Sequence, residues 1–165
     1  MLLTEQGLWA LAEYRFSHWG LIRVRLPVVR QLMLFVSLIW HKLVEVATGI
    51  CLPAGATIGK GLYIGHFGGI FLSGHAVLGE HCTLSQCVTV GYGGRGEGLG
   101  EPVVGDRVYI AAGAKVIGKI QVGNDVAIGA NAVVVKDVPD HAVVVGVPAR
   151  VVNMNGSADF LDPPA

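Results

Sequence analysis

Charge is scarce in this chain and evenly balanced between the two signs. Of its 165 residues, 12 are Lys or Arg and 12 are Asp or Glu, so the formal net charge is zero. A nucleic-acid-binding domain needs a basic stripe to meet the phosphates. The sequence has no such stripe, and we therefore exclude nucleic acid as a partner.

Cysteine is also rare, and a secretory leader is not evident. The three cysteines, Cys51, Cys82 and Cys87, are odd in number and lack the spacing of metal ligands, so we expect reduced thiols. The first residues, MLLTEQGLW, show no basic region followed by a long apolar core and a cleavage site. These features predict a cytoplasmic protein.

What the chain does have is an apolar residue at every sixth position between Val103 and Val138. Small or apolar side chains also stand two positions before most of these, and Gly, Asn and Asp recur between the pairs. Residues i−2 and i share one face of a strand. The Gly, Asn and Asp residues between successive pairs tolerate the dihedral angles of turns. The period predicts a parallel β-helix, an all-β solenoid whose stacked coils bury one interior column. A Gly-rich β-sandwich is the alternative, but a sandwich has no reason to keep one register over six repeats. The six-spaced residues are Val104, Ile110, Val116, Val122, Ile128 and Val134, and their partners are Val108, Ala114, Ile120, Val126 and Ala132.

The repeats begin near Ile50 and change register once. After Ile58 and Ile64 the pattern slips by two residues within 66–69, which predicts a bulge in the wall and a candidate site. The series that follows places Cys82 inside as a core residue. Its members are Leu72, Leu78, Leu84 and Val90, with Ile70, Ala76, Cys82 and Val88 as partners.

A Gly-rich insertion, GYGGRGEGLGEP, interrupts the repeats at 91–102. It is not a phosphate loop, because no Gly-Lys-Ser/Thr follows it. An insertion of this length in a tight solenoid is more often functional than a slack linker. We expect it to leave the coil and to reach over the site of a neighbouring copy.

The first 48 residues carry a different pattern. Residues 4–19 predict a helix with Thr4 as its cap, an apolar stripe of Leu8, Leu11, Ala12, Phe16 and Trp19, and a stop at Gly20. A second helix is predicted over 28–46, with Pro27 near its start. It is apolar nearly all round, and its uncharged run, 31–40, is about half of a bilayer span. It can pack against the first helix or a neighbouring subunit, lie in a membrane interface, or cross a membrane.

The predicted organisation is therefore N-terminal helices at 1–48, a β-helix at 49–152 that includes the loop 91–102, and a flexible tail at 153–165. Five stretches of this β-helix resemble the hexapeptide-repeat acyltransferases, and most closely the serine acetyltransferase family. They are GATIGKG at 55–61, GHFGGI at 65–70, AVLGEHCTLSQCVTVGYGG at 76–94, VYIAAGAKVIGKIQVGNDVAIGANAVVVKDVP at 108–139 and GVPARVV at 146–152. The resemblance implies a left-handed parallel β-helix, a homotrimer with active sites between neighbours, and acetyl-CoA as the donor.

The resemblance also implies catalytic residues. His66 matches the family's catalytic histidine, which implies that it acts as a general base. The acid that precedes this histidine in the family is Gly65 here, and the aspartate that orients it matches Cys51. A second active-site histidine, in a His-Pro dipeptide, matches Glu101, which is the second catalytic candidate. Candidate partners for His66 are Glu80, Glu101 and Asp106, and Gly68 and Gly69 can offer backbone N–H groups to an oxyanion.

These departures favour an acceptor other than serine, and the chain resembles the polysaccharide-associated branch of serine-acetyltransferase-like enzymes, which O-acetylate sugars. We predict acetyl transfer to a hydroxyl of a sugar or polysaccharide intermediate, at the cytoplasmic face of a membrane that residues 1–48 can contact. The alternatives are a serine O-acetyltransferase of cysteine synthesis and a trimeric scaffold without catalysis. Candidate coenzyme-binding residues, by the same resemblance, are Ala112, Ala130, Val135, Lys136 and Arg150. His75 and His81 are six residues apart and predict an outward-facing histidine column, and no metal is predicted.

Overall fold

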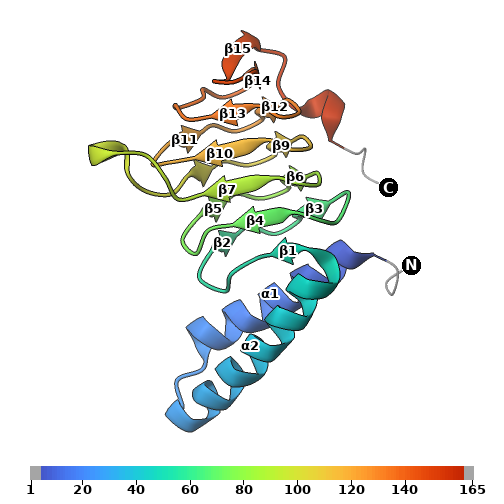
Figure 1. Ribbon diagram of the computed structural model, residues 1–165, viewed down its shortest axis with the longest axis vertical. Helices are drawn as coiled ribbons and strands as arrows, with labels where there is room; N and C mark the ends of the chain where they lie inside the picture. Colours follow the sequence, from blue (N-terminus) through green and yellow to red (C-terminus); the bar gives the residue numbers. More distant parts are fainter. Residues whose placement is uncertain (1–4, 162–165) are drawn as a thin grey trace.

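The computed structural model describes residues 5–161 and shows a helical hairpin beneath a stack of short strands (Figure 1). The helices are α1 (Gln6–Arg23) and α2 (Pro27–Thr48). The strands are β1 (Ile50–Cys51), β2 (Thr57–Ile58), β3 (Tyr63–Ile64), β4 (Ile70–Leu72), β5 (Val77–Leu78), β6 (Thr83–Leu84), β7 (Thr89–Gly91), β8 (Val103–Val104), β9 (Tyr109–Ile110), β10 (Lys115–Ile117), β11 (Gln121–Val122), β12 (Ala127–Ile128), β13 (Val133–Val134), β14 (Val143–Val145) and β15 (Arg150–Asn153).

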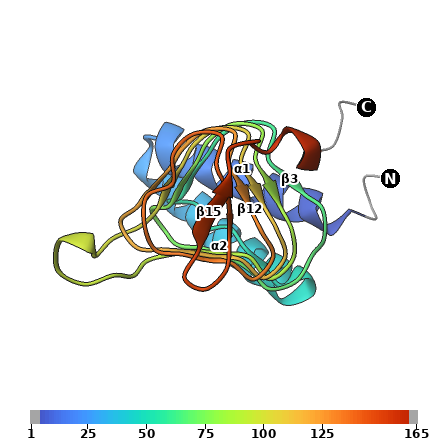
Figure 2. The ribbon, with the colours of Figure 1, turned by 90° about the horizontal axis from the view of Figure 1, so that it is seen from above.

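From β1 to β13 every third strand belongs to the same sheet, so the chain winds around three faces. Sheet A has the order β1-β4-β7-β10-β13, sheet B the order β2-β5-β8-β11, and sheet C the order β3-β6-β9-β12-β14-β15. All pairings are parallel except the last, between β14 and β15. Seen along its axis the stack is a rounded prism, with the loop after β7 projecting from it (Figure 2). The predicted left-handed parallel β-helix is confirmed.

The interior column consists of the residues that the six-residue period selects. All four apolar series are buried, with exposed fractions of 7% or less, so the β-sandwich alternative is wrong. Cys82 has an exposed fraction of 0%, as predicted. Burial raises the pKa of its thiol to about 11, because the apolar interior disfavours the thiolate.

The prism has three corners, which we name after the sheets they join: A/B, B/C and C/A. Three six-residue sides complete one coil, so residues six apart lie on different corners of the same coil. His75 therefore lies on the A/B corner, before β5, and His81 on the B/C corner, before β6. The predicted histidine column is wrong. The position of His81 is shared instead by Arg107, Asp125 and His141, all with φ between 54° and 59°.

At the lower end of the stack, α1 supplies polar groups to the first coil. The Tyr14 hydroxyl donates to the Ala56 carbonyl at 2.8 Å and accepts from the Ile58 N–H at 3.0 Å. Arg15 donates to the Ile58 carbonyl at 2.6 Å. These bonds satisfy backbone groups that have no lower coil to pair with.

Because α1 makes these hydrogen bonds to the first coil, its buried face differs from the apolar stripe that the sequence predicts. The predicted stripe is wrong: the buried residues are Ala10, Glu13, Tyr14, Ser17 and Gly20, while Leu8 and Trp19 are exposed. Gly20 does not end the helix, because it packs against Met33 of α2, and the helix continues to Arg23. The predicted cap, Thr4, lies outside the described residues.

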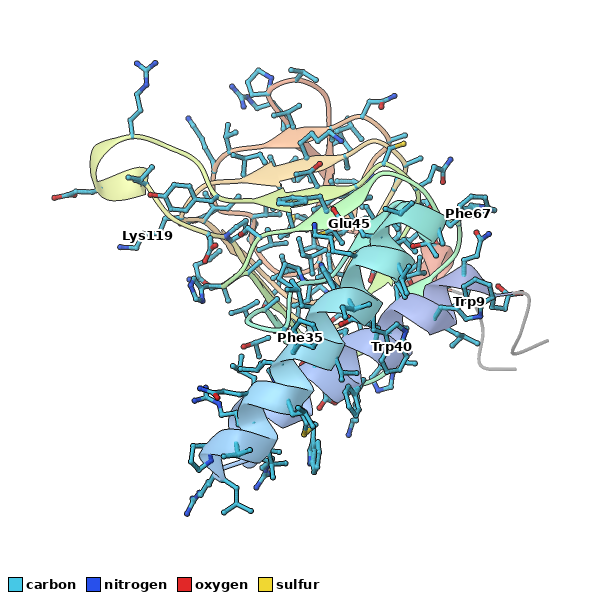
Figure 3. The ribbon with its side chains drawn as sticks, turned by 60° about the horizontal axis from the view of Figure 1, so that its bottom comes forward. Trp9, Phe35, Trp40, Glu45, Phe67 and Lys119 are labelled. Carbon is cyan, nitrogen blue, oxygen red and sulfur yellow. The ribbon has the colours of Figure 1, made fainter. Side chains whose placement is uncertain are left out.

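α2 is largely uncovered. Among the residues that the structure describes, only Ser37, Val44 and Thr48 of this helix are buried. Phe35 is exposed, whereas the ring of Trp40 packs against Phe16 of α1 at 5.5 Å (Figure 3). Leu32 and Phe35 have exposed fractions of 69% and 62%. By length and composition α2 could cross a membrane, and 11% of its most apolar window is buried.

The upper end of the stack is covered by the last part of the chain. β15 turns back antiparallel on β14, and the segment after it returns to the side of the coils. There the Ser157 hydroxyl donates to the Arg107 carbonyl, and the ring of Phe160 stacks on Tyr109 at 5.4 Å. Residues 153–161, which we predicted as part of a flexible tail, are therefore folded onto the prism.

Candidate active site

The wall of the β-helix bulges at His66, where the register slip predicts it. β3 ends at Ile64 and β4 begins only at Ile70. Gly68 and Gly69 adopt φ of 95° and 66°, which favours glycine at both positions. The Gly68 carbonyl accepts from the Cys87 N–H of the next coil at 2.8 Å, so the bulge is tied to the stack.

His66 is exposed at this bulge, on the C/A corner. It lines a pocket of about 240 Å³ together with Gln6 and Gly7, from the start of α1, and Ile64 and Phe67. No hydrogen bond to its imidazole is present among residues 5–161. The backbone N–H groups of Gly68 and Gly69 likewise make no backbone hydrogen bond within the described chain.

None of the three predicted partners lies on the corner that carries His66. Glu101 is on the A/B corner, where its carboxylate accepts from the Ser73 hydroxyl at 2.8 Å and from the His75 N–H at 3.2 Å. Glu80 and Asp106 are on the B/C corner; Asp106 accepts from the Glu80 N–H at 2.7 Å. Within one protomer the structure therefore does not bring His66 together with Glu101.

Two of the candidate coenzyme-binding residues share the corner of His66. Ala112 follows β9 and Ala130 follows β12, so both lie where sheet C turns into sheet A. The Asn131 N–H donates to the Ala112 carbonyl at 2.9 Å, which places the two turns on successive coils. Small side chains on this corner leave the backbone accessible above the bulge.

The other three candidates meet near the top of the stack. Val135, Lys136 and Arg150 line one pocket of about 250 Å³, between the end of β13 and the start of β15. The two cationic side chains are exposed. Their proximity creates a positively charged surface that suits phosphate groups.

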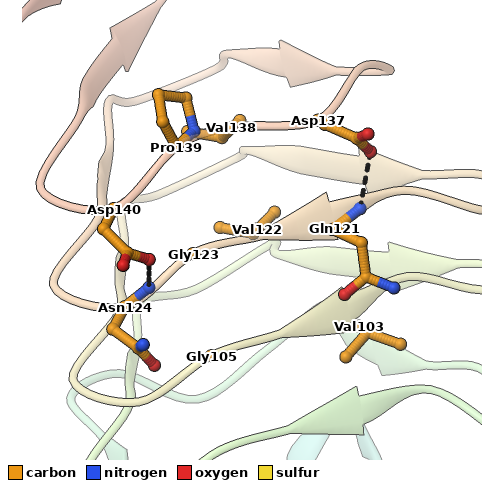
Figure 4. Close-up of a pocket in the computed structure, with 10 residues that line it drawn as sticks. All are labelled: Val103, Gly105, Gln121, Val122, Gly123, Asn124, Asp137, Val138, Pro139 and Asp140. Carbon is orange, nitrogen blue, oxygen red and sulfur yellow. Dashed lines mark hydrogen bonds between the residues drawn. The ribbon is translucent and has the colours of Figure 1, made fainter.

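A hollow of about 500 Å³ lies on sheet B (Figure 4). Its carboxylates are already engaged by the backbone: Asp137 accepts from the Gln121 N–H at 2.8 Å, and Asp140 accepts from the Asn124 N–H at 2.7 Å. Its lining residues include no Lys or Arg. This hollow is therefore a poor place for the phosphates of a coenzyme.

A further cluster of reactive side chains was not predicted from the sequence. His41 of α2 contacts Glu13 of α1 (Nδ1 to Oε2, 3.0 Å) and Cys51 of β1 (Nε2 to Sγ, 3.8 Å). Hydrogen bonds to Cys51 and to Glu13 raise the pKa of His41 to about 10. The signal that could have revealed the cluster is the four-residue spacing of His41 and Glu45, which puts both on one helix face.

Comparison with known proteins agrees with this architecture. The family model described as "Bacterial transferase hexapeptide (six repeats)" matches residues 101–136. The chain is 38% identical over 156 residues to a serine acetyltransferase of Synechococcus elongatus, covering 94% of this chain and 61% of that protein. It is 37% identical over 152 residues to one of Helicobacter pylori, covering 92% of this chain and 84% of the relative. The chain belongs to the serine acetyltransferase family.

A solved structure extends the match to three dimensions. A serine acetyltransferase in complex with CoA superposes with a TM-score of 0.77 at 34% identity, covering 92% of this chain and 59% of the other. The chain thus spans about three fifths of several of these relatives. Because the relatives are serine acetyltransferases, they do not support the predicted place in a polysaccharide-associated branch.

Proposed function

We propose that this protein is an acetyl-CoA-dependent O-acetyltransferase and that its acceptor is serine. The observation that carries the proposal is the match to serine acetyltransferases over 94% of the chain, which includes the bulge that exposes His66. The relative solved with CoA supports the choice of donor. The candidate coenzyme-binding residues Ala112 and Ala130 lie above His66 on the same corner.

The chemistry follows from an imidazole beside a hydroxyl. An alcohol is a weak nucleophile while it keeps its proton, and His66 removes that proton as the oxygen attacks the thioester carbon. The carbon–sulfur bond then breaks, and the CoA sulfur leaves with a proton. The unpaired N–H groups of Gly68 and Gly69 are available to the oxyanion that forms between these steps.

The active unit in this proposal is a homotrimer in the cytoplasm. His66 and Glu101 occupy different corners of one prism, so two copies packed side by side can bring them to a shared groove. The loop between β7 and β8 projects from the prism next to Glu101 and can extend over the neighbouring copy (Figure 2). This arrangement supplies His66 with a carboxylate that residues 5–161 of its own protomer do not.

A sugar hydroxyl is the second candidate acceptor, and one observation favours it. Gly65, Cys51 and Glu101 stand where the family motif has two acids and a histidine, and the Glu101 carboxylate is held by Ser73 and His75. The groups expected to handle serine are thus replaced. A sugar acceptor at the membrane face would require contact with the membrane, and the exposed side chains of α1 and α2 would make that contact.

Release of free thiol from acetyl-CoA, measured with L-serine and with a panel of sugars, separates the two acceptors. We expect His66→Ala to lower turnover by about 100- to 10,000-fold while coenzyme binding and assembly remain. The matched control is His81→Asn, at an exposed histidine of the B/C corner where asparagine tolerates the positive φ. Full turnover in His66→Ala would remove His66 from the mechanism. If acetyl-CoA far above any plausible Kd leaves the melting temperature unchanged, the protein is a scaffold.

A further inference from the structure

We propose that His41, Glu45 and Cys51 form a zinc-binding site at the junction of the helical hairpin and the first coil, with Glu13 as a positioning residue. One ligand atom from each of the three residues lies within 4.8 Å of the other two. The turn at Gly49 adjoins Gly68 and Gly69 of the bulge, but none of the three residues lines the pocket that contains His66. The proposed site concerns metal binding, and it stands whether or not the proposed acetyl transfer is correct.

The local fold explains why these three residues meet. His41 and Glu45 are one turn apart on α2, so their side chains share a face of the helix. Gly49 ends the helix with φ of 66°, and its N–H donates to the Glu45 carbonyl at 2.8 Å. This left-handed residue reverses the chain, which brings Cys51 back beside the last turns of α2. Figure 3 shows Glu45 at the end of α2 that meets the coils.

The ligand atoms of His41 and Cys51 have nearly the spacing of two ligands in a tetrahedral zinc site. Zn–N and Zn–S bonds of about 2.0 and 2.3 Å place the nitrogen and the sulfur about 3.5 Å apart at a tetrahedral angle. The observed distance between His41 Nε2 and Cys51 Sγ is 3.8 Å. A thiolate, an imidazole and a carboxylate are the three side-chain donors that zinc accepts, and a fourth position remains for water.

The second nitrogen of His41 makes the contact that metal-bound histidines require. Glu13 Oε2 lies 3.0 Å from Nδ1, so Nδ1–H donates to the carboxylate and Nε2 faces Cys51. Glu13 has an exposed fraction of 2%, and the Ser17 hydroxyl donates to its other oxygen at 2.6 Å. A carboxylate buried at this cost is explained if it fixes the orientation of a ligand.

Two groups compete with the metal, and both can give way. Lys42 Nζ lies 2.6 Å from Glu45 Oε2, but this ion pair is on the surface and contributes little. A proton on His41 Nε2 must also be displaced. All three ligands are half-buried and therefore reachable from solvent. Glu13 and His41 additionally line an open pocket of about 250 Å³ beside Pro53 and Ala54.

Cobalt and zinc titrations of the full chain at pH 8 test the site. We expect one Co²⁺ per chain, with the intense charge-transfer absorption of a thiolate ligand, and its displacement by Zn²⁺. Cys51→Ser, a nearly isosteric change, should abolish that absorption, and Cys87→Ser, at an exposed thiol outside the cluster, should keep it. Glu13→Gln should weaken zinc binding by about 10- to 100-fold against a chromogenic chelator.

The opposite results are equally clear. Binding that is unchanged in Cys51→Ser, or lost in Cys87→Ser, means an adventitious ion only and overturns the site. Far-UV circular dichroism of each variant shows whether it has folded, and His41→Gln provides a second variant if Cys51→Ser has not. Because no acetyl donor is present, failure here leaves the proposed transferase activity untouched.

Discussion

The β-helix and the helical hairpin are both rich in large aliphatic side chains, but the β-helix buries them and α2 leaves most of them exposed. Leu84, on the coil interior, has an exposed fraction of 0%, and Leu32, on α2, has one of 69%. The coils repeat their apolar residues in one register, so every such residue points to one column. α2 carries apolar side chains on most of its surface, and of its residues only Ser37, Val44 and Thr48 are buried. The pattern of hydrophobic residues, more than their number, decides what is buried.

Leu84→Ala and Leu32→Ala test this contrast most strongly. Truncating a leucine in a packed column leaves a cavity, so Leu84→Ala should lower the free energy of unfolding by about 2–5 kcal/mol. Leu32→Ala should change it by less than about 0.5 kcal/mol, because its side chain is exposed. Urea unfolding followed by circular dichroism measures both. A large loss in Leu32→Ala would show that α2 is covered in solution by another copy or another partner.

Tyr14→Phe probes a buried contact between the helical hairpin and the first coil. The hydroxyl both donates to Ala56 and accepts from the Ile58 N–H, so its removal leaves buried backbone groups without partners. We expect a loss of about 1–3 kcal/mol in the free energy of unfolding. Tyr63→Phe is the control, since Tyr63 is half exposed and its hydroxyl makes no hydrogen bond within the described chain. Equal effects of the two variants would contradict this role for Tyr14.

The buried thiol of Cys82 makes the free energy of unfolding of the β-helix depend on pH. The pKa of this thiol is raised from 9.0 to about 11 in the folded chain, so between these values the unfolded chain loses the proton while the folded chain keeps it. Stability from this group is therefore complete below pH 9 and declines as the pH rises toward 11. The unfolding free energy should be lower by about 1 kcal/mol at pH 10 than at pH 8, relative to Cys82→Ala. Parallel pH curves for the two proteins would show that the thiol is not desolvated.

Much of the fold could be predicted because the repeat is local. A period of six fixes the buried residues, and the two-residue slip at 66–69 locates the bulge. The buried face of α1 could not be predicted, because Tyr14 and Glu13 are buried for their hydrogen bonds and not for their apolar surface. The His41–Cys51 contact could not be predicted either, because it joins α2 to β1 and depends on the chain reversal at Gly49. To predict that His66 and Glu101 lie on different corners, one must know that each coil has three sides. One must also know where the inserted loop 91–102 leaves and rejoins the coil, and the sequence does not show this.

The two ends of the stack have a consequence for how the protein stays in solution. The backbone N–H and C=O groups of each coil pair with those of the next coil. A terminal coil would therefore leave a row of unpaired groups, which is a template for pairing with another molecule. Tyr14 and Arg15 close the lower template, and the reversed strand Arg150–Asn153 closes the upper one. Cutting the chain after Val145 would uncover the second template and invite end-to-end growth into filaments. The short final strand is in this sense a terminator of polymerisation.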